Sequence, residues 1–153
     1  MFETVVVATD GSESAERAVD VALDLADRFD AAVHALNVVD ESEIEATPSA
    51  VRADLEEALE ATGGRAVTFV REQAETDVEG TEVVTAVRVG HPADEIIQYA
   101  TEHDADLVAT GTRGRHGEHS FLLGSVAEAV VRRCPVPVLT VRQLEAEEAP
   151  PRP

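Results

Sequence analysis

The stretch TVVVATDGSESAERAVDVALDLADRF (residues 4–29) joins a strand-like segment directly to a helix-like segment, and this junction decides the fold class. Its first six residues form an almost continuous apolar run, which is typical of a parallel strand buried on both faces. From Ser12 onward the apolar residues recur at helical spacing, at Ala15, Ala18, Val19, Ala22, Ala26 and Phe29. A buried strand followed by a helix of this length predicts the first half of a β-α-β unit.

The same alternation continues through the rest of the chain. Further strands are predicted at residues 31–39, 81–89, 105–110 and 136–141, and further helices after Val51, at Pro92 and after Ser125. The polar segment DESEIEATPS (residues 40–49) is predicted to be a loop. The helical period that starts at Val51 passes through Gly63 and Gly64, which favours one long helix. A break into a strand at AVTFV (residues 66–70) is the alternative.

Strands that alternate with helices predict a doubly wound α/β domain of the Rossmann-like kind. We expect a five-stranded parallel sheet with strand order 3-2-1-4-5 and helices on both faces. Pro137 lies inside the fifth predicted strand and indicates that this strand is at a sheet edge. We expect one domain over residues 1–143, followed by a disordered acidic and proline-rich tail at residues 144–153.

The charge of the chain is strongly negative. Thirty-one acidic residues face twelve basic residues, all of them arginine, and the formal net charge is −19. This balance argues against nucleic acid and anionic membranes as partners, because no basic patch is available to neutralise phosphates. It indicates either an ordinary solvated acidic surface or, as we favour, a halophilic cytoplasm whose salt screens the repulsion. The absence of lysine also excludes a P-loop.

Other features predict a cytoplasmic protein. The chain enters a strand-like run without a basic leader, and no apolar run approaches the roughly 18 residues that span a membrane. The single cysteine, Cys134, excludes an internal disulfide and a cysteine-based zinc site, and we interpret it as a small buried hydrophobe.

Two predicted strand ends carry residues that suit a ligand. The first ends at Asp10 and Gly11, and the fourth leads into GTRGRHGEHSFLLGS (residues 111–125), which holds four of the nine glycines. With strand order 3-2-1-4-5 these two ends flank one crevice, where ligands bind in such sheets. Asp10 would face a hydroxyl-bearing part of the ligand or a metal ion that bridges phosphates.

The helix after Gly124 and Ser125 is the better of the two phosphate sites at this crevice. The first helix begins with Glu13 and Glu16, whereas the later one has no acid before Glu128, so its N–H groups and positive dipole end suit an anion. Arg113 and Arg115 could supply positive charge. Backbone N–H groups at Gly111 and Gly114 could turn inward as an anion nest.

Simpler interpretations stay open for each of these residues. The glycine-rich stretch alone is compatible with an ordinary loop, and Asp10 alone with a helix N-cap. His116 and His119 could form a metal pair or only belong to the loop. We interpret His34 as a core or sheet-face histidine and His91 as a turn residue.

Together these residues make the chain resemble a single-domain, ATP-binding universal stress protein. The family signature G-x2-G-x9-G-[ST] corresponds to Gly111, Gly114, Gly124 and Ser125. The opening VVVATDGSESAERAVDVALDLA (residues 5–26) and the segment VAEAVVRRCPVPVLTVR (residues 126–142) are also similar to the family. The resemblance covers about residues 2–142.

The resemblance implies an adenine nucleotide alpha hydrolase-like fold that binds ATP with Mg²⁺ or Mn²⁺. Thr9 and Asp10 match the strand end that lies against the nucleoside, and Val38 matches the position whose backbone recognises adenine. The glycine-rich stretch matches the loop and helix start that bind the ribose and the phosphates. The implied binding residues are Thr9, Asp10, Val38, Gly111, Thr112, Arg113, Gly114, Gly124, Ser125 and Val126.

The resemblance also implies a nucleotide-dependent regulatory or stress-survival factor and a homodimer formed through the fifth strands (residues 136–141). The protein partner of such a factor is unknown. Two alternatives stay open: a weak ATP hydrolase or nucleotidyl-type enzyme, and a dimeric interaction module that binds no nucleotide.

Overall fold

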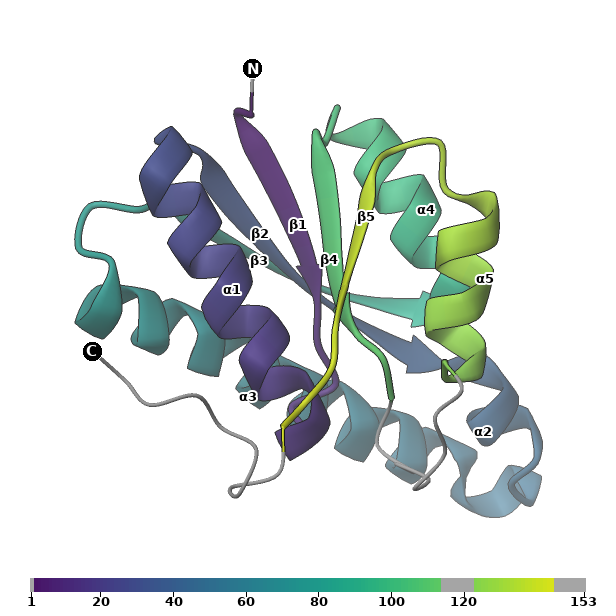
Figure 1. Ribbon diagram of the computed structural model, residues 1–153. Coiled ribbons are helices and arrows are strands. Elements are labelled where there is room, and N and C mark those ends of the chain that lie inside the picture. Colours follow the sequence, from purple (N-terminus) through teal and green to yellow (C-terminus); the bar gives the residue numbers. More distant parts are fainter. Residues whose placement is uncertain (1, 114–122, 145–153) are drawn as a thin grey trace.

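Five parallel strands form one sheet in the order β3-β2-β1-β4-β5, as predicted (Figure 1). The structure, a computed structural model, describes residues 2–113 and 123–144. Val5 of β1 pairs with Val33 of β2 on one side and with Leu107 of β4 on the other. The winding direction therefore reverses between β1 and β4. The strands are β1 (Thr4–Ala8), β2 (Ala32–Asp40), β3 (Val83–Gly90), β4 (Leu107–Gly111) and β5 (Val138–Val141).

Helices cover both faces of the sheet, also as predicted. Helices α1 (Glu13–Phe29) and α3 (Arg52–Asp77) lie on one face, and α4 (Pro92–Glu102) and α5 (Ser125–Arg133) lie on the other (Figure 1). Val5 and Val7 of β1 belong to the core cluster under α1 and α3, whereas Val6 belongs to the cluster under α4 and α5. Both faces of β1 are thus buried, which explains its continuous apolar run.

Helix α3 runs unbroken through Gly63 and Gly64, so the prediction of one long helix is confirmed and the alternative strand at residues 66–70 is wrong. The helix turns small and β-branched residues toward the sheet. Its buried residues are Gly63, Ala66, Val67, Val70 and Ala74. Because most of this face is small, the helix backbone lies close to the sheet.

Two short helices replace the loop that was predicted at residues 40–49. They are α2 (Glu41–Glu45) and the 3-10 helix η1 (Ser49–Val51). The last residue of β2, Asp40, caps α2, because its Oδ1 accepts hydrogen bonds from the Ser42 N–H (3.0 Å) and the Ser42 hydroxyl (2.6 Å). The loop prediction was wrong because this local cap outweighs the polar composition of the segment.

The edge position of β5 is as predicted, but Pro137 precedes the strand rather than lying inside it. The Pro137 carbonyl accepts a hydrogen bond from the Val108 N–H (2.9 Å), so the residue already borders β4. Cys134 packs against the cluster under α4 and α5 as a small hydrophobe, although it is half-buried rather than buried as expected. Residues 145–153 of the predicted tail lie outside the described residues.

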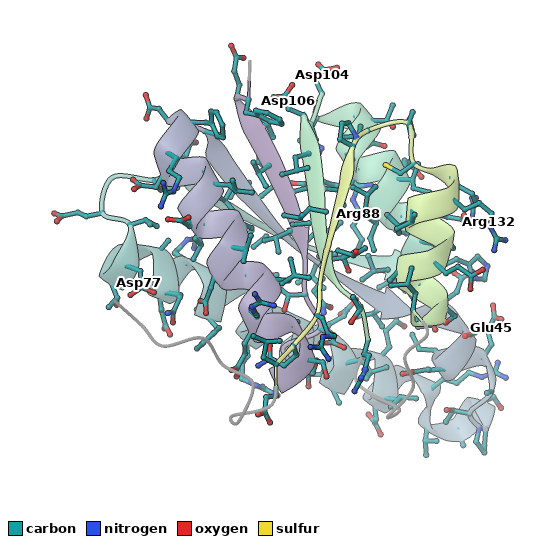
Figure 2. All side chains as sticks on the ribbon, viewed as in Figure 1. Glu45, Asp77, Arg88, Asp104, Asp106 and Arg132 are labelled. Carbon is teal, nitrogen blue, oxygen red and sulfur yellow. The ribbon has the colours of Figure 1, made fainter. Side chains whose placement is uncertain are left out.

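Acidic side chains project from the periphery of the fold. Glu45, Asp77 and Asp104 are exposed, and Figure 2 shows them on three different sides of the molecule. Asp106 differs, because its carboxylate accepts hydrogen bonds from the N–H groups of Glu3 (2.7 Å) and Thr4 (3.1 Å), and these bonds lower its pKa. Within the described residues, no helix is long and apolar enough to cross a membrane.

Candidate functional site

A cavity of about 560 Å³ opens at the carboxyl ends of β1, β2 and β4. It lies where the winding reverses, which is the position at which open α/β sheets bind ligands. Its volume is within the range of roughly 300–1,000 Å³ that small-molecule sites occupy. All predicted binding residues that the structure describes line this cavity: Thr9, Asp10, Val38, Gly111, Thr112, Arg113, Gly124, Ser125 and Val126.

The turn after β1 is held by short local hydrogen bonds. The Thr9 hydroxyl accepts from the Gly11 N–H (3.1 Å), and Asp10 Oδ1 accepts from the Ser12 N–H (2.9 Å). Gly11 has a φ of 77°, a conformation that favours glycine. The N-cap of α1 is Ser12 rather than Asp10, so the simpler interpretation of Asp10 as a helix cap is wrong. Asp10 instead borders the cavity with one carboxylate oxygen engaged in the turn.

The end of β2 presents backbone groups to the same cavity. The Leu36 carbonyl accepts a hydrogen bond from the Thr9 N–H (2.9 Å). Because alternate residues of a parallel strand direct their backbone groups to the same side, those of Val38 face the same side as those of Leu36. The pairing of β1 ends with Ala8 opposite Leu36. The Val38 N–H and C=O therefore point past the end of β1 toward the cavity.

Gly111, the last residue of β4, is required for close packing. A Cβ atom at this position would lie 2.8 Å from the Ser14 carbonyl oxygen and 3.6 Å from Ala15 Cα. The φ angle of Gly111 is outside the left-handed region, which only Gly11 and Gly80 occupy among the described glycines. The predicted anion nest also involves Gly114, which lies outside the described residues, so the nest stays a prediction.

The start of α5 closes the far side of the cavity. Gly124 is the N-cap residue, and its carbonyl accepts the first helical hydrogen bond, from the Glu128 N–H (2.9 Å). The Gly124 N–H donates to the Thr112 carbonyl (2.7 Å), which ties the helix start to the end of β4. The N–H groups of the next three residues, Ser125 to Ala127, precede the first helical bond and point out of the helix end. This end suits an anion.

Charge is divided unevenly around the cavity. Its lining includes the carboxylates of Asp10, Asp40 and Glu43 but, among the described residues, only one cationic side chain, that of Arg113. Asp10 follows β1, Asp40 ends β2 and Glu43 lies in α2. Arg113 follows β4, and its neighbour Thr112 is hydrogen-bonded to the start of α5 through the Gly124 N–H. An anionic ligand would therefore direct its charge toward α5.

Several predicted residues lie outside the described residues. They are Gly114, Arg115, His116 and His119. The metal pair suggested for His116 and His119 therefore lies outside the described residues. Among the described residues, no group of three or more histidine, cysteine or acidic side chains could hold a metal ion.

The cavity is also lined by residues that were not predicted from the sequence, among them Asn37, Asp40, Glu43, Leu59, Pro92 and Leu123. Asp40 is the last residue of β2 and Asp10 lies just beyond the end of β1, so the rule that found Asp10 could also have found Asp40. Leu59 belongs to the helical apolar set of α3. Glu43 lies in a segment that was predicted to be a loop, and the sequence carried no signal for it.

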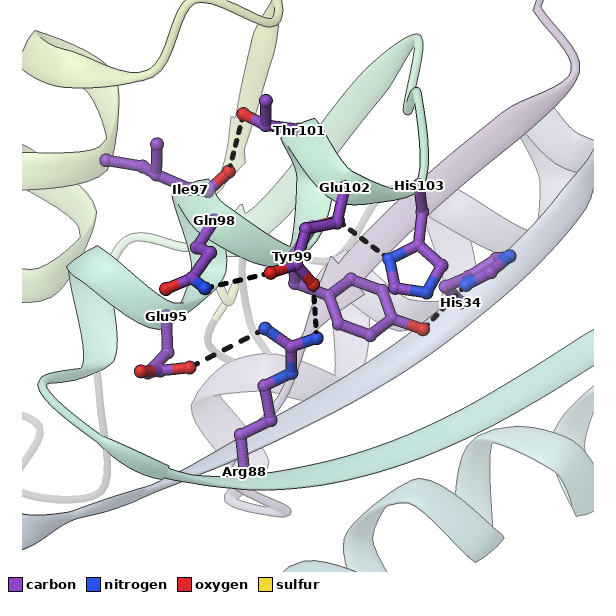
Figure 3. Close-up of polar contacts among 9 residues, drawn as sticks. All are labelled: His34, Arg88, Glu95, Ile97, Gln98, Tyr99, Thr101, Glu102 and His103. Atoms are coloured by element: carbon purple, nitrogen blue, oxygen red, sulfur yellow. Dashed lines mark hydrogen bonds and ion pairs between the residues drawn. The ribbon is translucent and has the colours of Figure 1, made fainter.

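A second polar cluster lies between α4 and the strands β2 and β3, and its residues are not part of the cavity (Figure 3). The Arg88 guanidinium forms ion pairs with Glu102 (2.6 Å) and Glu95 (3.6 Å) and lies 4.8 Å from the Tyr99 ring centre. His34 faces this cluster, in agreement with its interpretation as a sheet-face histidine.

His91 is the N-cap residue of α4, directly before Pro92 at the helix start, which agrees with its predicted turn role. Its Nε2 also lies 3.1 Å from Glu41 Oε1 of α2. This contact joins two helices whose residues border the cavity, since Glu43 and Pro92 both line it.

Comparison with known proteins identifies related sequences and structures. The model of the family described as "Universal stress protein family" matches residues 1–142. A universal stress protein of Methanocaldococcus jannaschii, MJ0531, is 36% identical over 96% of this chain and 86% of its own length. The solved universal stress protein UspA from Lactobacillus plantarum superimposes with a TM-score of 0.79 at 28% identity, covering 92% of this chain and 98% of that one.

A further solved relative is a universal stress protein in complex with cAMP. It superimposes with a TM-score of 0.68 at 29% identity, and the match covers 94% of this chain and 98% of that one. That protein therefore binds an adenine nucleotide on the same overall fold.

Proposed function

This chain belongs to the universal stress protein family, and from that premise we propose that it binds ATP, with Mg²⁺ or Mn²⁺ bridging the phosphates, and acts as a nucleotide-dependent regulatory factor. The observation that carries the proposal is the convergence of the predicted binding residues on one cavity. Residues from three strand ends and one helix start, which are far apart in sequence, meet there. The cAMP complex of a relative supports an adenine nucleotide as the ligand class.

The nucleoside would lie at the ends of β1 and β2. The outward-facing backbone N–H and C=O of Val38 offer one donor and one acceptor, which is what the edge of an adenine ring requires. Leu59 and Ile96 supply apolar surface for the base. Asp10 would accept hydrogen bonds from ribose hydroxyl groups with the carboxylate oxygen that is not engaged by Ser12.

The phosphates would lie at the start of α5. The unpaired N–H groups there, the Ser125 hydroxyl and the Arg113 guanidinium are the groups that suit them. Three carboxylates line the same cavity, so a divalent cation would offset the repulsion between them and a triphosphate. The described residues offer no metal-binding cluster of their own, and the cation would therefore be held mainly through the phosphates.

We also propose a homodimer through the free edge of β5. Among the residues that the structure describes, β5 pairs only with β4, through Val138 opposite Val108 and Val141 opposite Gly111. Its other edge carries backbone groups that a second copy of the strand would satisfy. A two-fold axis would then place the same residues of both copies opposite each other.

Native mass spectrometry of the freshly purified protein tests the nucleotide proposal. A co-purified adenine nucleotide would appear as a mass added to each subunit, and the same spectrum would report the oligomer. The proposal expects the mass of ATP or its hydrolysis products. A protein that carries no nucleotide and does not acquire one from added ATP with Mg²⁺ would contradict it.

A further inference from the structure

A buried amide connects β2 to the turn that carries Asp10. Asn37 is only 4% exposed, and its Nδ2 donates a hydrogen bond to the Thr9 carbonyl (2.9 Å). This bond continues the link between β1 and β2 beyond the last backbone contact, in which the Thr9 N–H donates to the Leu36 carbonyl. Burial of an amide is costly unless it is hydrogen-bonded, so the bond to Thr9 is what makes this side chain tolerable in the core.

The space for this amide exists because residue 63 of α3 is glycine. A Cβ atom on Gly63 would lie 2.2 Å from Asn37 Oδ1 and 2.8 Å from Asn37 Cγ, which are separations that real atoms do not adopt. The neighbouring Gly64 differs, since a Cβ atom there would meet nothing within 4 Å. Of the two adjacent glycines in α3, only Gly63 is therefore required by packing.

The same face of α3 also supports the turn directly. A Cβ atom on Gly11 would lie 3.0 Å from the Ala66 Cβ atom, one helical turn beyond Gly63. Helix α3 thus contacts the turn at Gly11 and, through Asn37, holds the turn at Thr9. Asp10 lies between these two points of support.

We propose that Asn37, in the space left by Gly63, is a positioning residue that holds the Thr9–Asp10 wall of the cavity in its ligand-binding geometry. This inference rests on the proposed function, because it concerns the same cavity. A purely structural role is the alternative. In that case Asn37 would only satisfy the Thr9 carbonyl, and ligand affinity would follow the stability of the fold.

Four variants of the full chain separate these roles: Asn37→Ala, Gly63→Ala, the double variant and Gly64→Ala. Asn37→Ala removes the bond to Thr9, and we expect about ten-fold weaker ATP binding. Gly63→Ala displaces the amide and should lower both the melting temperature and the affinity. In the double variant, Asn37→Ala also removes Oδ1 and Cγ of residue 37, the two atoms closest to the Cβ atom that Gly63→Ala introduces. The double variant should therefore regain much of the melting temperature lost by Gly63→Ala, yet remain about ten-fold weak in ATP binding.

Gly64→Ala is the matched control. It places the same methyl group on the adjacent residue of the same helix, where there is open space. We expect its ATP affinity to equal that of the wild type and its melting temperature to be unchanged or higher. Titration calorimetry with ATP and Mg²⁺ gives the affinities, and thermal unfolding without ligand gives the melting temperatures.

Amide hydrogen exchange in the ligand-free protein tests the geometry without any ligand. If Asn37 holds the turn, Asn37→Ala should speed exchange of the Gly11 and Ser12 N–H groups, while exchange in the centre of β1 changes much less. Unchanged exchange at Gly11 and Ser12 would overturn the inference. So would wild-type ATP affinity in Asn37→Ala, or a double variant whose affinity recovers together with its stability.

Failure of the proposed function would look different from failure of this inference. If the wild type binds no adenine nucleotide, the proposed function is wrong, and the exchange rates of Gly11 and Ser12 alone decide whether Asn37 holds the turn. If the wild type binds ATP and Asn37→Ala binds it equally well, the proposed function stands and the positioning role is wrong.

Discussion

The hydroxyl oxygen of Tyr99 lies 2.7 Å from Nδ1 of His34, and this contact joins helix α4 to strand β2 (Figure 3). The Tyr99 ring also stacks on His103 at a centroid distance of 3.9 Å, and the rings of His34 and His103 are 5.1 Å apart. Burial, aided by the charge of His103, lowers the pKa of His34 below its ordinary value of 6.5, while Glu82 acts in the opposite direction. The folded protein therefore favours a neutral His34 imidazole.

This preference predicts a pH dependence of stability. Between the lowered pKa of folded His34 and the ordinary value near 6.5, the unfolded chain binds more protons than the folded chain. The stabilisation from a neutral His34 is thus complete above about pH 6.5 and is lost as the pH falls through this window. Denaturant unfolding of the wild type and of His34→Gln at several pH values measures it. As the pH falls, the free energy of unfolding of the wild type should decrease more than that of His34→Gln. A difference between the two proteins that stays constant with pH would contradict the account.

Gly111→Ala should damage both the fold and the cavity. The new Cβ atom would lie 2.8 Å from the Ser14 carbonyl oxygen, so α1 and β4 must separate slightly. We expect a loss of about 1–3 kcal/mol of stability and a clear loss of ATP affinity. Gly80→Ala is the control, because Gly80 has a φ of 93° and open space around it, away from the cavity. It should lose roughly 1–2 kcal/mol through backbone strain and keep its affinity. Equal ATP affinity in both variants would refute the prediction.

The acidic surface predicts a strong salt response. With a net charge of −19, repulsion acts across the surface until salt shortens the screening length to about 10 Å at 0.1 M and less at higher concentrations. We expect the melting temperature to rise steeply as KCl increases from dilute to molar concentration. Thermal unfolding followed by circular dichroism measures this, and a flat response would remove the proposal of a halophilic protein.

The proposed dimer predicts that charges on β5 yield monomers. The double substitution Val138→Lys and Thr140→Lys would place two positive charges next to the same two charges of the partner strand. Val138 also packs against the core of its own subunit, so Thr140→Lys alone is the milder variant that guards against unfolding. Light scattering measures the mass, and circular dichroism confirms that the variants are folded. Folded variants that remain dimeric would place the interface elsewhere.

Much of the fold could be predicted from the sequence because β1 and its neighbours are buried on both faces. Such burial leaves continuous apolar runs, and the helices between them keep an apolar face at helical spacing. The position of the cavity could also be predicted, since Asp10 follows one strand and Gly111 ends its neighbour once the order 3-2-1-4-5 is assumed. The five-residue helix α2 could not, because it buries no residue and depends on the cap from Asp40.

The reason for each glycine could not be read from the sequence. Gly111 was expected, with Gly114, to shape an anion nest, and the structure gives Gly111 a further role, because it lets β4 pass close to the Ser14 carbonyl. Gly63 and Gly64 look equivalent in sequence, yet only Gly63 faces the buried amide of Asn37. Both distinctions depend on how a helix is placed against the sheet, and this placement follows from packing rather than from local periodicity.

Titration calorimetry with ATP is the measurement that tests the central claim most directly. The wild-type chain, first stripped of any co-purified ligand, is titrated with ATP, AMP and GTP in high KCl with Mg²⁺, beside Ser125→Ala and Gly124→Val. The account predicts that ATP binds well and AMP less well, that Ser125→Ala loses about 0.5–1.5 kcal/mol, and that Gly124→Val loses most of its ATP affinity with an unchanged circular dichroism spectrum. A stripped wild type that binds no adenine nucleotide, or a Gly124→Val variant that binds ATP as the wild type does, would contradict it.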